Sequence, residues 1–146
     1  MKTFKHLLIE LNACREAVKW AKDKTIEEVI QECNRGDWLL WLAQEVNIAL
    51  KPLILAKGHC ANTVRHLINE ETSIKALDTV IAFGEGKATC GELDYASAFH
   101  YINVAVYTSV SAASAYASAE IKKKTADICR KNIGDLIINK VNELIK

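Results

Sequence analysis

Tyr95–Ala119 reads YASAFHYINVAVYTSVSAASAYASA, and this stretch decides how the chain folds. It contains no Asp, Glu, Lys or Arg, although 25% of the whole chain is charged. It also lacks Gly and Pro, the residues that most often interrupt helices, so it predicts one long helix. A helix of this length without charges is either a membrane span or a buried strut against which other helices pack.

The polar content of Tyr95–Ala119 favours the buried strut. Ser, Thr, Asn and His side chains are spread along it, and they disfavour insertion into a bilayer. The neighbouring segments are amphipathic, so each needs an apolar surface to cover. We therefore expect no membrane contact. Residues 1–146 are expected to form a single all-α domain, a bundle of about six to seven helices around this long Ala/Ser-rich central helix.

The composition argues against a nucleic-acid binder and favours a cytoplasmic protein. The chain has 146 residues and a net charge of +1, so it lacks the basic surface on which a nucleic-acid binder relies. Its five cysteines are scattered and form no CxxC pair. The N-terminal sequence lacks the long apolar core of a secretion signal. We therefore expect reduced thiols and a cytoplasmic protein. Four of the cysteines fall on predicted apolar faces, where they act as inert hydrophobes.

The first half of the chain carries clear helix signals. A helix over residues 12–23 is predicted to begin at a capping Asn12, with Trp20 as the anchor of its amphipathic face. Thr25 and Glu28 form a capping box for a second helix, which is predicted to end at a left-handed Gly36. Asp37 is predicted to cap a third, apolar helix. Its two tryptophans, Trp38 and Trp41, are predicted to fill core, so that removing either costs about 3–5 kcal/mol.

Later helices have weaker boundaries. Pro52 suits the first turn of a helix that is predicted to continue to Ile68, and Ser73 is predicted to cap the next. Thr89 and Glu92 form a second capping box, which would start the long helix. A final amphipathic segment follows, and residues 89–145 form either one bent helix or two. Its predicted buried stripe is Ala126, Cys129, Ile133, Leu136, Ile137, Val141 and Leu144.

No catalytic motif stands out. The chain has no HExxH, no G-x-S-x-G, no P-loop and no dinucleotide fingerprint. His59 and His66 are seven apart, hence on one side of the predicted helix, but no second pair completes a zinc site. We expect neither a metal nor another cofactor, and we do not expect an enzyme.

One edge of the long helix is polar but uncharged. Such an edge is either a partly solvated helix face or a contact surface, since uncharged groups cost little to desolvate and Tyr is a favoured interface residue. This candidate partner-binding stripe consists of His100, Asn103, Tyr107, Ser111, Ser114 and Ser118.

Two charged pairs admit a structural and a functional interpretation. Arg35 and Asp37 flank Gly36, just before the double-tryptophan turn, and Asp127 and Arg130 lie one turn apart on the last helix. They either cap helices and form ion pairs that fix how helices dock, or they form a recognition patch.

Segments at both ends of the chain resemble the Imm-5-like family of bacterial immunity proteins. The specific part is CNRGDWLLWLA at residues 33–43, and ADICRK at 126–131 and NAC at 12–14 also match. The chain departs from the family pattern in its middle, where the alanine-rich tract is shorter and richer in serine and valine. The residues that carry the resemblance, as structural or recognition residues, include Trp20, Arg35, Gly36, Asp37, Trp38, Trp41, Asp127 and Arg130.

The resemblance implies a small cytoplasmic protein that binds and neutralises a cognate bacterial toxin without catalysis. It carries over no catalytic residue. The alternative is a structural or self-associating helical module of a prophage or mobile element, in which the neutral stripe would be a homo-oligomer surface.

Overall fold

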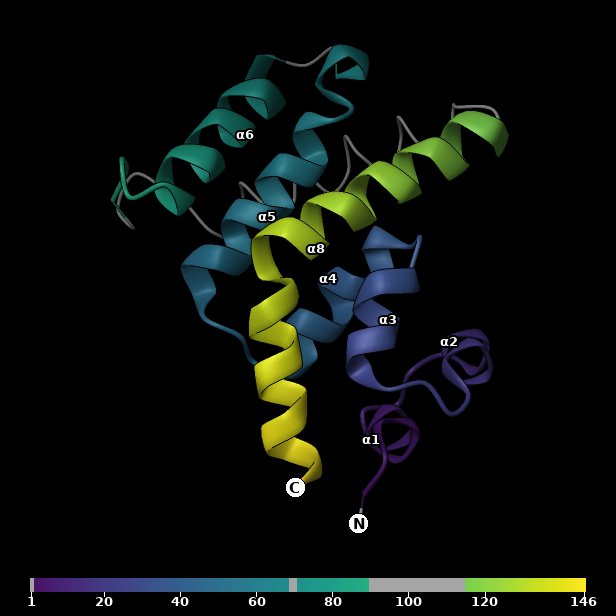
Figure 1. The fold of residues 1–146 in the computed structure, drawn as a ribbon. Coiled ribbons are helices and arrows are strands. Elements are labelled where there is room, and N and C mark those ends of the chain that lie inside the picture. Colours follow the sequence, from purple (N-terminus) through teal and green to yellow (C-terminus); the bar gives the residue numbers. More distant parts are fainter. Residues whose placement is uncertain (1, 69–70, 90–114) are drawn as a thin grey trace.

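The structure is a computed structural model that describes residues 2–68, 71–89 and 115–146. Over these ranges the chain forms seven α-helices and one short 3-10 helix, without strands, so the predicted all-α class is confirmed. A long bent helix crosses between two groups of helices (Figure 1). The bounds are α1 Phe4–Glu10, α2 Arg15–Ala21, α3 Ile26–Glu32, α4 Gly36–Glu45, α5 Leu50–Asn62, η1 Arg65–Leu67, α6 Glu71–Gly84 and α8 Ala115–Ile145.

The N-terminal segment forms two short helices instead of the single predicted one. Thr3 caps α1 through a capping box with His6, a start that the sequence analysis missed. Asn12 is not a cap, because its φ of 59° places it in the left-handed region, where the chain turns between the helices. Cys14 precedes α2 as its N-cap and is exposed, so it does not lie on an inert apolar face as predicted.

The link between α3 and α4 is governed by packing. The Thr25–Glu28 capping box that opens α3 is confirmed, since each residue's side chain accepts from the other's backbone N–H. Gly36, however, is the first residue of α4 and not a left-handed terminus. Glycine is needed there because an added Cβ would lie 2.2 Å from Thr125 Oγ1 and 2.6 Å from the Thr125 carbonyl carbon. Asp37 does not cap the helix either, as Arg35 holds the N-cap position.

The middle of the chain folds as a helical hairpin. Pro52 lies in the first turn of α5, as predicted, but α5 ends at Asn62 and a separate 3-10 turn carries His66. The predicted face of one continuous helix from His59 to His66 is therefore wrong. Ser73 is buried inside α6 and does not cap it, because α6 begins at Glu71.

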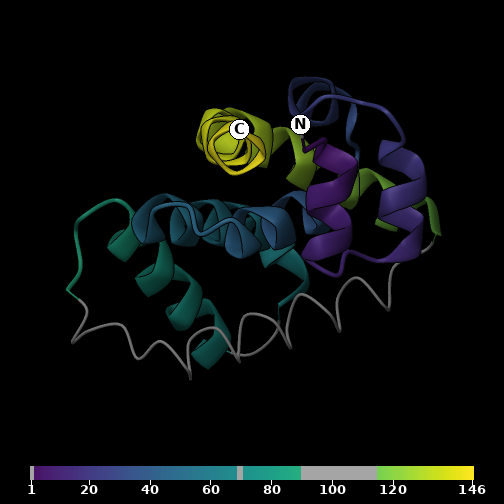
Figure 2. The ribbon, with the colours of Figure 1, turned by 90° about the horizontal axis from the view of Figure 1, so that it is seen from below.

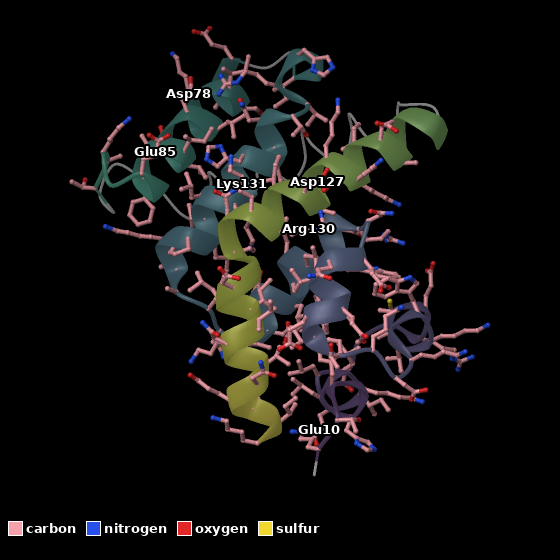
Figure 3. All side chains as sticks on the ribbon, viewed as in Figure 1. Glu10, Asp78, Glu85, Asp127, Arg130 and Lys131 are labelled. Carbon is pink, nitrogen blue, oxygen red and sulfur yellow. The ribbon has the colours of Figure 1, made fainter. Side chains whose placement is uncertain are left out.

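Helix α8 is one continuous helix that bends in the stretch marked by Arg130 and Lys131 (Figures 1 and 3). The Asn132 side-chain amide donates to the Ile128 carbonyl at 2.8 Å, and such competition within the hydrogen-bond ladder accompanies helix bends. Gly134 is buried just beyond, where an added Cβ would lie 3.2 Å from Ile30 Cγ2. Most of the predicted stripe is buried, but Leu144 is 45% exposed.

Two apolar clusters hold the described helices together. The main cluster joins α1, α2, α3, α4, α5 and α8, and includes Leu39, Ile133 and Ile137. A smaller cluster lies between α5 and α6 and includes Leu77 and Val80. Seen from below, α5 and α6 lie together on one side, while α1 lies on the other (Figure 2). Helix α5 therefore connects both clusters.

The charge-free stretch Tyr95–Ala119, around which the bundle was predicted to form, is only partly described. Residues 90–114, and with them Glu92 of the second capping box, lie outside the described ranges. Among the helices that are described, none is both long enough and apolar enough to cross a bilayer.

Substituting Gly36 by Ala is expected to destabilise the fold by about 1–3 kcal/mol, since the new methyl group overlaps Thr125 backbone and must displace α8. Gly134→Ala is the matched control: its nearest contact is a side-chain methyl, and alanine favours the helix by about 1 kcal/mol. Urea unfolding followed by circular dichroism measures both. Equal stability of Gly36→Ala and the wild type would show that α4 and α8 are not in this close contact.

Candidate functional site

The chain's three tryptophans lie around one apolar hollow, which we call the tryptophan groove. The groove has a volume of about 420 Å³ and is formed by α1, α2, α3 and α4. Trp20, Trp38 and Trp41 are all only partly buried. The prediction that Trp38 and Trp41 fill the core is confirmed only in part. Both rings pack against the main apolar cluster, but both stay partly exposed along the groove, so truncating either should cost less than the 3–5 kcal/mol of a fully buried ring.

Helical spacing places these rings along the groove. On α2, Ala17, Trp20 and Ala21 recur three and four residues apart and share one face. On α4, Trp38 and Trp41 are one turn apart, beside the buried Leu39 and Leu42. The alanines of α2 leave the space that the large rings of α4 border. The hollow therefore lies beside the small residues of α2 and is bordered by Trp20 of the same helix and by the two tryptophans of α4.

Contacts between the rings and nearby cations fix the groove's edge. The ring centroids of Trp20 and Trp38 are 6.1 Å apart with an interplanar angle of 59°, a tilted arrangement that aromatic pairs favour. The Arg35 guanidinium lies 4.4 Å from the Trp38 ring centroid, and the Lys24 ammonium 5.5 Å from that of Trp20. Cations at these distances are attracted to the ring faces. Each of these two rings is therefore held by a neighbouring cation.

The polar side of the groove carries one paired carboxylate. Arg35 donates from Nε and Nη2 to the two carboxylate oxygens of Asp37, at 3.0 and 2.7 Å, and Glu16 lies 3.9 Å away from the guanidinium. Burial raises the pKa of the Asp37 carboxyl, but the Arg35 guanidinium more than offsets this, and the pKa lies below its usual range. Asp37 therefore remains ionised at neutral pH while its charge is balanced by Arg35.

Arg130 ties α8 to the end of α3. Its guanidinium donates to the Ile30 carbonyl at 2.7 Å and to the Cys33 carbonyl at 2.8 Å, and it also pairs with Asp127. The last carbonyls of a helix lack partners within the helix, so a cation there satisfies them. Figure 3 places Asp127 and Arg130 on the part of α8 that runs across α3. Arg130 thus fixes α8 against the C-terminal end of α3.

The structure brings together most, but not all, of the residues that carry the resemblance. Trp20, Asp37, Trp38 and Trp41 line the groove, Arg35 stacks on its edge, and Gly36 sets the approach of α4 to α8. Asp127 and Arg130 instead lie on α8, where Arg130 contacts the end of α3 and pairs with Asp127. The two charged pairs thus have different surroundings: Arg35 and Asp37 border an open surface, whereas Arg130 serves helix docking.

The predicted neutral stripe is not covered by the structure. His100, Asn103, Tyr107, Ser111 and Ser114 lie outside the described residues. Ser118 belongs to α8, but its side chain also lies outside what the structure describes. Its role as a contact surface stays a prediction.

A second hollow lies between α5 and α8, and residues with polar side chains make up most of its lining. It has a volume of about 460 Å³ and is lined by His59, Thr63, Asp127 and Lys131, among others. Figure 3 shows Lys131 on the side of α8 that faces α5. Among the described residues, no three His, Cys, Asp or Glu side chains gather as a metal site would require. His66, beyond the end of α5, does not line this hollow.

Sequence reasoning missed the tryptophan groove because it assigned every large apolar residue to the core. One signal could have identified the groove. The helices α1, α2 and α3 have only 7 residues each, and such short helices offer little surface with which to enclose three tryptophans. Large rings on or beside such short helices are therefore candidates for a surface site.

No protein-family model, curated protein sequence or solved structure matches the chain.

Replacing Arg130 by Lys is expected to lower stability by about 1.5–3 kcal/mol, because an ammonium cannot span two α3 carbonyls as the guanidinium fork does. Asp127→Asn is the matched control. The Asp127 side chain is 64% exposed, so losing its ion pair with Arg130 should cost less than about 1 kcal/mol. Chemical denaturation measures the stability of both variants. An Arg130→Lys protein as stable as Asp127→Asn would contradict the proposal that Arg130 holds α8 against α3.

Proposed function

We propose that this chain is an immunity-type protein, which binds and neutralises a cognate bacterial toxin without catalysing a reaction. The observation that supports the proposal is the tryptophan groove: three large rings lie partly exposed around a hollow of about 420 Å³. Tryptophan dominates the energetics of protein interfaces, and it does so where it borders a pocket that a partner fills.

The composition of the groove favours an apolar occupant. Most of its lining is apolar, and its one carboxylate, Asp37, is already balanced by Arg35. A charged occupant would find no unpaired opposite charge among these groups, whereas an apolar one gains by covering the rings. The proposed occupant is therefore a segment of the toxin that inserts bulky apolar side chains between α2 and α4.

The sequence segment that carries the resemblance also supports this site. Asp37, Trp38 and Trp41 of that segment line the groove, and Arg35 and Gly36 position them. A segment that both builds and lines a surface serves recognition and folding together. The choice of a toxin, and not another protein, as the partner rests on the resemblance alone.

Filling the groove from within tests its role while keeping all three tryptophans. Ala17 lines the groove and is partly buried, so Ala17→Arg should obstruct the groove with a long charged side chain. Ala82 is an equally partly buried helical alanine on α6, and Ala82→Arg is the matched control. In cells that express the toxin encoded beside this gene, the wild type and Ala82→Arg should restore growth and Ala17→Arg should not.

Binding measurements give the expected magnitude. Loss of a central tryptophan anchor costs at least about 2 kcal/mol, so Trp38→Ala should raise the Kd for the toxin roughly 30-fold or more. The exposed Leu50 lies outside the groove, and Leu50→Ala should leave the Kd unchanged. Circular dichroism confirms that each variant is folded.

Two results would refute separate parts of the proposal. If the toxin kills equally with and without the wild-type protein, the immunity function is wrong. If the wild type protects and Ala17→Arg protects as well, the groove is not the contact surface. A stable dimer of the wild type that Ala17→Arg dissociates, seen by light scattering, would instead assign the groove to self-association.

A further inference from the structure

Two buried thiols face each other at the contact between α5 and α8. The Sγ atoms of Cys60 and Cys129 are 3.9 Å apart, and the residues are 69 positions apart in the chain. Cys60 is 7% exposed and Cys129 is 0% exposed. Both are free thiols in the structure. The tryptophan groove uses neither of them.

We propose that Cys60 and Cys129 form a redox modification site, at which a small peroxide converts the two thiols into an intramolecular disulfide that links α5 to α8. Closing the bond requires the sulfur atoms to approach by about 2 Å, since the S–S bond length is about 2.05 Å. Helices α5 and α8 already pack against each other there.

Backbone carbonyls contact both thiols, and the two cysteines differ in how readily they react. Cys60 Sγ lies 3.7 Å from the Thr125 carbonyl oxygen and Cys129 Sγ 3.8 Å from that of Gly36, so each thiol has a weak acceptor close by. The hydrogen bond with Cys60 and burial raise the pKa of the Cys129 thiol. Cys129 is therefore a poor initial nucleophile, and Cys60, the less enclosed thiol, reacts first.

The chemistry balances with one peroxide. The Cys60 thiolate attacks one oxygen of hydrogen peroxide, the O–O bond breaks, and a sulfenic acid forms while hydroxide leaves. The Cys129 sulfur then attacks the Cys60 sulfur, the S–O bond breaks, and a second hydroxide leaves. The two hydroxides take up the two thiol protons as water. The pair of cysteines is oxidised by two electrons and the peroxide is reduced to two waters.

Linking the two helices should strengthen the fold. The disulfide closes a loop between residues 69 positions apart and so restricts the unfolded chain. The oxidised protein should have a higher urea midpoint, and dithiothreitol should return it to that of the reduced protein.

Peptide mapping tests the site in a Cys14→Ser/Cys90→Ser protein, which retains Cys33, Cys60 and Cys129. After treatment of the folded protein with hydrogen peroxide, two of three thiols should be lost and a non-reduced digest should contain Cys60 linked to Cys129. Cys33 should remain free, because its sulfur contacts the Arg35 carbonyl at 3.6 Å, whereas the sulfur atoms of Cys60 and Cys129 face each other.

Variants decide between this pairing and others. Adding Cys33→Ala should leave the crosslink intact, and adding Cys60→Ala should abolish it without loss of folding by circular dichroism. The same oxidation in 8 M urea should lose the preference for this pair. A linkage that includes Cys33, or oxidation of Cys60 to sulfinic acid without any crosslink, would overturn the proposal.

Discussion

The close contact between the start of α4 and the middle of α8 is the constraint on which the other helices depend. Gly36 permits it, because any side chain there would occupy the space of Thr125. A few residues along α8, Arg130 satisfies the last carbonyls of α3, so the α3–α4 corner is held from both sides. Since α4 carries Trp38 and Trp41, this corner sets where the rings of the tryptophan groove lie.

The same constraint explains how very short helices persist. The helices α1, α2 and α3 have 7 residues each, too few to be stable alone in water. Their order comes from packing on α4 and α8, and from the capping boxes of α1 and α3. With so little surface, they cover Trp20, Trp38 and Trp41 only partly. The groove thus follows from the architecture, and a partner that fills it would complete the apolar packing.

The parts of the fold that were predictable are those determined by local sequence. The Thr25–Glu28 box depends on residues three apart, and the buried stripe through Ala126, Cys129 and Ile133 depends on helical period. The sequence alone could not reveal why Gly36 is glycine, because its reason lies in Thr125, far along the chain.

The candidate site shows the same division between local and long-range information. The resemblance identified the residues, but which of them line a surface and which hold helices together depends on tertiary contacts. Asn12 was misassigned for a related reason. Asparagine suits both a helix cap and a left-handed turn, and the packing of α1 against α2 selects the turn. The facing thiols of Cys60 and Cys129 likewise have no signature in sequence spacing.

Hydrogen–deuterium exchange of the protein with and without its toxin tests most directly whether the tryptophan groove is the contact surface. The groove is built largely by α2 and the first turns of α4, so the account predicts that binding slows exchange in residues 14–21 and 36–42 and leaves α6 unchanged. Protection confined to α6, or to residues 95–118, with none in α2 and α4, would contradict it.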